Sequence, residues 1–158
     1  MKRFILAGLA GAGTLAAVGV WAGSGADDKP ALSVLGAPVD AAMIALGQEV
    51  YAENCASCHG VDLEGQPDWR RRLENGRMPA PPHDKTGHSW HHADRQLFTI
   101  TKRGVSAVVP GYESDMPAFE ETLTDAEITA VLGYIKSTWP ERERDFQAEV
   151  TANDGGGQ

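Results

Sequence analysis

The sequence is poor in cysteine, with Cys55 and Cys58 the only two among its 158 residues. A disulfide between them would close too short a loop to stabilise the fold, which excludes a structural disulfide framework. The chain also lacks an excess of positive charge, since 14 Lys and Arg residues face 22 Asp and Glu residues and the net charge is −8. This balance argues against a nucleic acid as partner. No internal repeat is visible, and the length suits one domain with appendages.

The longest stretch without a charged residue begins at Phe4 near the N-terminus, and its residues 4–23 contain only Thr14 as a polar side chain. The basic residues Lys2 and Arg3 precede this run, and small residues follow it at 24–26. This order is typical of an export signal, whereas the length of the run also suits a single membrane anchor. We therefore predict that residues 1–26 are a cleaved signal peptide or a membrane anchor. In both cases the rest of the chain lies outside the cytoplasm.

The two cysteines belong to the segment Cys55-Ala56-Ser57-Cys58-His59-Gly60, which has the C-x-x-C-H arrangement of c-type haem attachment. On a helical turn, residues three and four apart lie on one face. Both thiols can therefore reach the vinyl groups of one porphyrin while His59 binds its iron. Two alternatives stay open. One is a redox-active disulfide, although its usual βαβ context is not visible, and the other is a zinc site completed by two downstream histidines.

Local signals predict three helices. Asp40 can cap a helix over residues 41–54, where apolar residues recur at helical spacing. A second helix is expected over residues 94–103 and ends at Gly104. A Thr-x-x-Glu capping box opens a third helix over residues 125–138, which ends before a proline.

The segments between and beyond these helices are expected to be less regular. Residues 27–39 contain proline and glycine without sustained periodicity, which predicts a linker. Residues 61–87 are rich in Gly, Pro and Arg, which predicts loops with one short helix near residues 68–73. Residues 141–158 are charged and then glycine-rich, which predicts a partly disordered tail. The folded domain is therefore expected over residues 40–140.

Four of the five histidines lie within ten residues, namely His83, His88, His91 and His92. Imidazole binds copper and zinc well, so this cluster could hold copper. The spacing, however, matches no tight ligand motif. In the alternative interpretation one histidine caps the next helix, while the others lie at the surface or contact haem propionates.

Met116 is the candidate for a second iron ligand. A thioether is a soft, neutral ligand that suits haem iron opposite His59, and a His/Met pair raises the reduction potential. Pro117 follows it and stiffens the loop. The alternative is that Met116 is an ordinary loop methionine, and Met78 is its rival outside the predicted helices.

Together these features resemble a class I monohaem c-type cytochrome of the exported bacterial kind over residues 40–140. The resemblance rests on four segments, which are residues 55–60, 97–104, 116–119 and 123–136. It implies an all-α fold of three to five helices wrapped around one covalent haem c. It also implies that the first and last helices of the domain cross at a steep angle.

The resemblance also implies roles for individual residues. Cys55 and Cys58 become the thioether anchors of the haem, and His59 and Met116 become its axial ligands. A proline carbonyl from residues 81–82 then orients the His59 ring.

The function expected from this resemblance is single-electron transfer in a redox or respiratory chain on the periplasmic side of a bacterial inner membrane. With both axial positions filled, the chain is expected to be an electron carrier rather than an enzyme. Its acidic surface predicts a redox partner with a basic face. Segment 69–92 is longer, more basic and richer in histidine than the family pattern. Two alternatives therefore remain, a ligand sensor or peroxidase-like enzyme with labile Met116, and a copper-handling module that uses residues 83–92.

Overall fold

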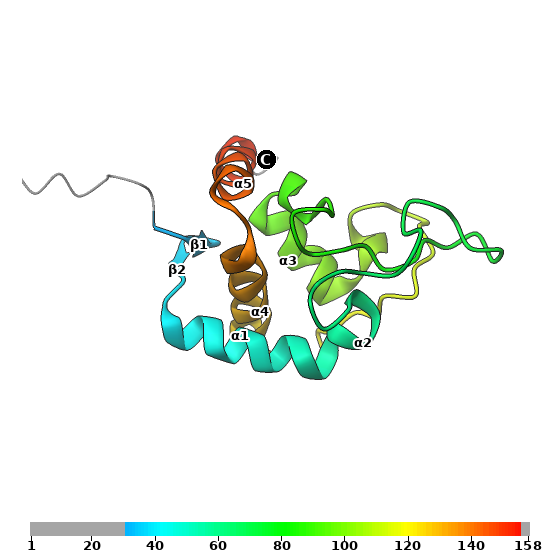
Figure 1. Cartoon of the computed structure of the whole chain (residues 1–158), viewed down its shortest axis with the longest axis horizontal. Helices are drawn as coiled ribbons and strands as arrows, with labels where there is room; N and C mark the ends of the chain where they lie inside the picture. Colours follow the sequence, from blue (N-terminus) through cyan, green and yellow to red (C-terminus); the bar gives the residue numbers. More distant parts are fainter. Residues whose placement is uncertain (1–30, 156–158) are drawn as a thin grey trace, which may run out of the picture.

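A computed structural model describes residues 31–155 of the chain (Figure 1). Its α-helices are α1 (Ala41–Asn54), α2 (Ala56–His59), α3 (Asp94–Arg103), α4 (Asp125–Thr138) and α5 (Glu141–Asn153). Two short 3₁₀ helices lie at Ser89–His91 (η1) and Val105–Ala107 (η2). The prediction of an all-α fold with three to five helices is confirmed.

The predicted signal peptide or anchor at residues 1–26 lies outside the described residues. Across residues 31–155, no helix combines the length and the apolar character that a membrane span requires.

The helix ends follow the local signals in the sequence. The Asp40 carboxylate accepts a hydrogen bond from the Met43 N–H at 2.8 Å and caps α1. At α4, the Glu127 N–H donates to the Thr124 hydroxyl oxygen while the Glu127 carboxylate accepts from the Thr124 N–H, so both halves of the capping box form. Gly104 has a positive φ of 81° and ends α3. These three predictions are confirmed.

Helices α1 and α4 cross steeply and build the framework of the domain (Figure 1). Gly47 makes the crossing possible, because a Cβ atom built there would lie 2.0 Å from the Ala130 carbonyl oxygen. Around the contact, Tyr51 from α1 packs with buried residues of α4, among them Ile128 and Val131. The close approach of the two backbones therefore depends on a residue without a side chain.

The linker predicted at residues 27–39 is partly structured. A short antiparallel hairpin pairs β1 (Ser33–Val34) with β2 (Ala37–Pro38). The Val34 side chain is fully buried, and the Leu35 N–H donates to the Asp94 carboxylate at 2.9 Å. The prediction of a simple tether is therefore wrong for this stretch, because contacts with α3 and α4 fix a segment that has no local periodicity.

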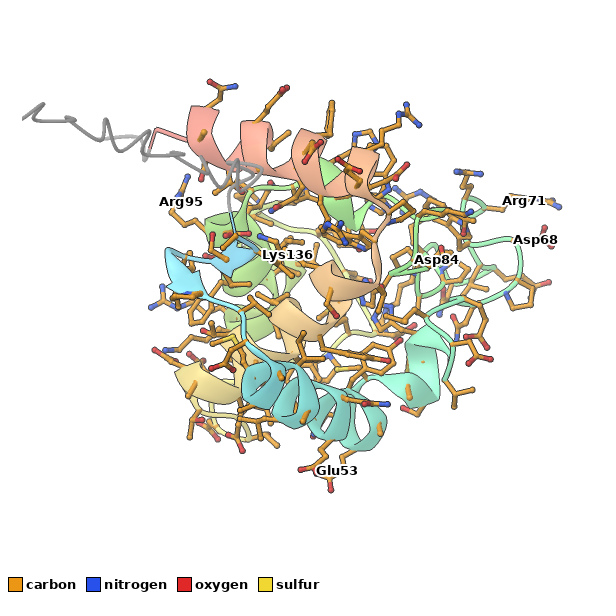
Figure 2. All side chains as sticks on the ribbon, turned by 60° about the vertical axis from the view of Figure 1, so that its left-hand side comes forward. Glu53, Asp68, Arg71, Asp84, Arg95 and Lys136 are labelled. Atoms are coloured by element: carbon orange, nitrogen blue, oxygen red, sulfur yellow. The ribbon has the colours of Figure 1, made fainter. Side chains whose placement is uncertain are left out.

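The predicted disordered tail is also wrong for residues 141–153, which form α5. The helix is held by Gln147, whose side chain is 1% exposed and donates to the Asp94 carboxylate at 2.8 Å. The same carboxylate accepts from the Lys136 ammonium group at 2.6 Å, and both side chains of this pair are buried. Figure 2 labels Lys136. A charged sequence can thus be ordered by a few long-range polar contacts.

The short helix expected near residues 68–73 is not present. Turns and irregular backbone connect α2 to η1 across residues 61–88, and they form the outer loops of the molecule beyond α2 and α3 (Figure 1).

Candidate functional site

The cysteine motif lies where α1 passes into α2. Cys55 ends α1, since its N–H donates to the Tyr51 carbonyl at 2.9 Å, and it also opens α2, since its own carbonyl accepts from the His59 N–H at 2.9 Å. Cys55, Cys58 and His59 therefore lie on one short turn, as the spacing predicts. Burial, and secondarily the neighbouring Cys58, raises the pKa of the Cys55 thiol to about 11.

The His59 ring is buried and oriented by a proline. Its Nδ1 lies 2.8 Å from the Pro81 carbonyl oxygen. A carbonyl can only accept, so Nδ1 carries the hydrogen and Nε2 keeps a free lone pair. Burial lowers the pKa of His59, while the bond to Pro81 opposes this shift. The result is a neutral imidazole with one nitrogen ready to bind a metal.

Two glycines hold the proline segment against the His59 ring. A Cβ on Gly65 would lie 2.4 Å from the Pro82 nitrogen, and a Cβ on Gly87 would lie 1.9 Å from the Pro82 carbonyl oxygen. Gly65 also has a positive φ of 70°, and its N–H donates to the His59 carbonyl at 2.7 Å. Of the two prolines suggested by the sequence, Pro81 is the one whose carbonyl contacts the His59 ring.

His83 is part of the site, although the sequence pattern had indicated it only as a member of the histidine cluster and not as a neighbour of His59. Its ring stacks on His59 with the centroids 4.0 Å apart, and its Nδ1 lies 2.8 Å from the Ser89 hydroxyl. The Trp139 indole N–H donates to the His83 carbonyl at 2.7 Å. Burial, followed by the neighbouring His59 and His88, lowers the pKa of His83 well below its usual value. The sequence contained a signal for this contact. In an extended segment residues 81 and 83 face the same side, so a proline that meets His59 at position 81 places His83 near the same ring.

Two adjoining cavities, of about 170 and 400 Å³, form one cleft beside this cluster. The smaller is lined by Cys55 and Cys58, and the larger by apolar side chains of α3 such as Leu97 and Ile100. Four residues line both cavities, namely His59, Met78, His83 and Met116. The cleft therefore brings both thiols, the His59 imidazole and the predicted Met116 thioether to one space.

The loop that carries Met116 is attached to the end of α3. The Phe119 N–H donates to the Thr101 carbonyl at 3.2 Å, and the Glu120 N–H donates to the Lys102 carbonyl at 3.0 Å. The Met116 N–H donates to the Ser114 hydroxyl at 3.1 Å. The first two bonds fix the segment after the methionine to α3, and the third closes a turn within the loop.

The rival methionine, Met78, lies on the neighbouring loop and lines the same two cavities. The two loops are joined by an ion pair between Arg77 and Asp115. Both thioethers are therefore close to the cleft.

Comparison with known proteins supplies the family. The family model described as cytochrome c matches residues 44–139, which is more than half of the chain. The chain belongs to the cytochrome c family. Family membership implies a covalently bound haem c and supports haem-based electron transfer as the general function.

The relatives of this cytochrome include CcoP subunits of cbb3-type cytochrome c oxidases. The Rhodobacter capsulatus protein is 32% identical over 108 residues, which is 67% of this chain and 33% of the relative. The Azospirillum brasilense protein is 31% identical over 96 residues, covering 61% of this chain and 28% of the relative. The chain thus spans about a third of the length of these relatives. No solved structure gives a significant match.

The residues around the cleft fit a haem c. Covalent attachment needs two thiols on one helical turn, and iron needs a nitrogen donor with a free lone pair. Both are present, in Cys55, Cys58 and His59. A large apolar ligand also needs a mainly apolar cavity of several hundred Å³, which the walls from α3 and the methionine loop supply.

The histidine segment does not form the predicted copper site. His83 turns to His59, His88 stacks on Trp69, and His91 packs against Phe146 of α5. Within residues 31–155, no group of three or more His, Cys, Asp or Glu side chains is arranged to hold a metal ion. The copper hypothesis is therefore not supported, since only His88 and His92 of this segment contact each other, while His83 stacks on His59 and His91 packs against α5.

Proposed function

We propose that this cytochrome is a carrier of single electrons and not an enzyme. In this proposal Cys55 and Cys58 hold the haem as thioethers, and His59 and Met116 are its axial ligands. The observation that carries it is the cleft itself, in which thiols, imidazole and thioether from separate segments line one mainly apolar space. When bound, haem c supplies an iron that alternates between Fe(II) and Fe(III).

Each residue has a distinct task in this proposal. His59 stays neutral because it is buried, and Pro81 keeps its Nδ1 hydrogen in place so that Nε2 faces a metal. Both methionines precede a proline, so the choice rests on what holds each segment. Met116 is preferred over Met78 because its segment is bonded to the end of α3, whereas the segment after Met78 is bonded to the loop residue Gln66. With two protein ligands, no coordination position is left open for a substrate.

The proposed domain limits and location follow from the same reasoning. Residues 40–140 form the haem-binding unit, and residues 1–26 act as an export signal or membrane anchor. The carrier would then work on the periplasmic side of a bacterial inner membrane, in a respiratory or redox chain. Because the relatives are subunits of cbb3-type oxidases, an oxidase of that type is a candidate partner.

Absorption spectra of the purified protein, oxidised and then reduced, test the site. A reduced α-band that stays with the denatured polypeptide, together with a weak far-red band in the oxidised protein, supports covalent haem with a methionine ligand. The Met116→Ala variant should lose the far-red band, whereas Met78→Ala should keep it. Loss of the band in Met78→Ala alone would transfer the ligand role to Met78. Carbon monoxide binding to the reduced wild-type protein would instead favour the sensor or peroxidase-like alternative.

The charge of the partner is a separate part of the proposal. The net charge of −8 favours a partner with a basic face, although exposed arginines at residues 70–72 lie beside Leu73 at the wall of the smaller cavity. Electron-transfer rates should fall as ionic strength rises, because salt screens the attraction. The variant Arg71→Glu distinguishes a basic from an acidic docking face on the partner. It should speed electron transfer to a partner with a basic face and slow transfer to a partner with an acidic face. Rates that do not depend on ionic strength would contradict electrostatic docking.

A further inference from the structure

The two halves of the cleft differ in the groups that could pair with an anion. The smaller cavity is lined by the two thiols, the Gln66 amide and the Asp115 carboxylate. The described residues that line the larger cavity include no carboxylate, and those that can donate a hydrogen bond from the side chain include His88, Ser89, His92, Gln96, Tyr112 and Ser114. A haem carries its two vinyl groups and its two propionates on different edges of the porphyrin. If the thiols take the vinyl edge, as proposed above, the propionates extend toward the larger cavity.

Two carboxylates in a mainly apolar space require hydrogen-bond donors, because an unpaired charge is costly to bury. His88 is suited to this task. Its ring lies parallel to Trp69, with the centroids 5.4 Å apart and the planes 8° apart, so stacking holds it in place. Its ring nitrogens make no hydrogen bond within residues 31–155, and they remain available to a ligand.

His92 is the second donor on this wall. Its ring meets His88 edge-on, with the centroids 5.2 Å apart. Its Nδ1 lies 3.0 Å from the Gln96 side-chain oxygen, which leaves Nε2 as the nitrogen free for another partner. A ring that donates from both nitrogens is positively charged, and such a charge complements a carboxylate.

His91 shows that the arrangement is selective. It lies between the two donors in the sequence, but its ring packs against Trp90 and Phe146 and lines neither cavity of the cleft. Because the backbone turns at η1, His88 and His92 line the cleft whereas His91 packs against α5.

We propose that the His88 and His92 side chains donate hydrogen bonds to the haem propionates and thereby set the reduction potential. This inference rests on the haem site proposed above. Donors offset the negative charge of the propionates, and that charge favours Fe(III) over Fe(II). Removing the donors should therefore lower the potential.

The test compares three phenylalanine variants of the holoprotein at a fixed pH. His88→Phe and His92→Phe keep an aromatic ring but lose the N–H donors, and His91→Phe is the matched control. The midpoint potential should fall in the first two variants and stay at the wild-type value in the control. His88→Gln, which restores a donor, should recover part of the loss. Resonance Raman bands of the propionate groups should shift in the first two variants alone.

The wild-type protein provides an independent readout. The titratable and charged groups near His88 are Arg70, His83, His92 and, outside the cleft, His91. Because a proton near the propionates is bound more tightly in the Fe(II) state, the potential should fall as the pH rises and the His88 side chain loses its proton. The slope should flatten in the variant that carries both His88→Phe and His92→Phe.

The outcomes separate this inference from the proposed function. Unchanged potentials and Raman bands in His88→Phe and His92→Phe would overturn the propionate role, even if the spectrum still shows covalent haem with a methionine ligand. Equal shifts in all three variants would also overturn it, because they would indicate a general change in packing. A wild-type protein without covalent haem would remove the proposed function first.

Discussion

Two regions build the site, and they are held together differently. In the crossing of α1 and α4, apolar side chains such as Tyr51 and Ile128 belong to one buried core, and Gly47 lets the two backbones approach. In the loop wall, defined as residues 61–93, single contacts such as the Pro81 bond to His59 fix each group. The packing energy of the helix crossing is distributed over many atoms. In the loop wall, by contrast, no other contact replaces a hydrogen bond that is lost. Changes in the crossing should therefore alter the free energy of unfolding, and changes in the loop wall should alter the spectrum and potential of the haem.

The largest expected effect concerns the buried pair that joins the helical framework to α3 and α5. The Lys136→Ala variant leaves the Asp94 carboxylate buried without its cation, and the side chains of this pair are 5% and 3% exposed. We expect a loss of about 3–5 kcal/mol in the free energy of unfolding. Urea unfolding followed by circular dichroism measures it. The control is Lys102→Ala, which breaks a more exposed pair with Asp125 and should cost under about 1 kcal/mol. Similar losses in both variants would contradict the central role of Asp94.

The next effect tests the crossing directly. The Gly47→Ala variant places a Cβ 2.0 Å from the Ala130 carbonyl oxygen, so the helices must separate. Alanine favours a helix by about 1 kcal/mol over glycine, yet we expect a net loss of about 1–3 kcal/mol from overpacking. Glu49→Ala, at an exposed position of α1, should change the stability by less than about 0.5 kcal/mol. A stabilised Gly47→Ala variant would show that the crossing is loose.

A change in the loop wall should alter the site more than the stability. The Gly87→Ala variant forces the Pro82 carbonyl away, since the new Cβ would lie 1.9 Å from it, and this moves Pro81 from His59. A less basic His59 binds Fe(III) less strongly, so the midpoint potential should rise. The control is Gly76→Ala, where the backbone also strains at a φ of 82° but no atom lies near the added Cβ. If Gly87→Ala and Gly76→Ala had equal midpoint potentials, the Pro81 contact with His59 would not be what sets the potential.

The smallest expected effect is the pH dependence of stability. Burial lowers the pKa of His83 in the folded chain, so the unfolded chain binds more protons as the pH falls. The contribution of His83 is present above about pH 6.5 and is lost progressively below it. The free energy of unfolding should therefore fall between about pH 7 and 5. In the His83→Phe variant, which keeps an aromatic ring on His59, this slope should be smaller. A slope unchanged by the substitution would contradict the shifted pKa of His83.

Much of the framework could be predicted, because its signals are local. The caps of α1 and α4, the end of α3 at Gly104 and the turn that holds the cysteine motif each depend on residues a few positions apart. The errors lie where distant contacts decide. Residues 33–38 and 141–153 have weak local signals, and both are ordered through the Asp94 carboxylate.

The sequence by itself determined which groups share a helical turn, since Cys55, Cys58 and His59 follow from a spacing of three and four residues. It also indicated Met116 and a proline carbonyl as partners of the site. The tertiary structure decided that Pro81 rather than Pro82 meets His59 and that His83 stacks on the same ring. It also decided that His88 and His92 meet while His91 turns to α5. Pro81 and His83 are far from His59 in the chain, and their contact with it depends on how Gly65 and Gly87 let the backbones close around the proline segment.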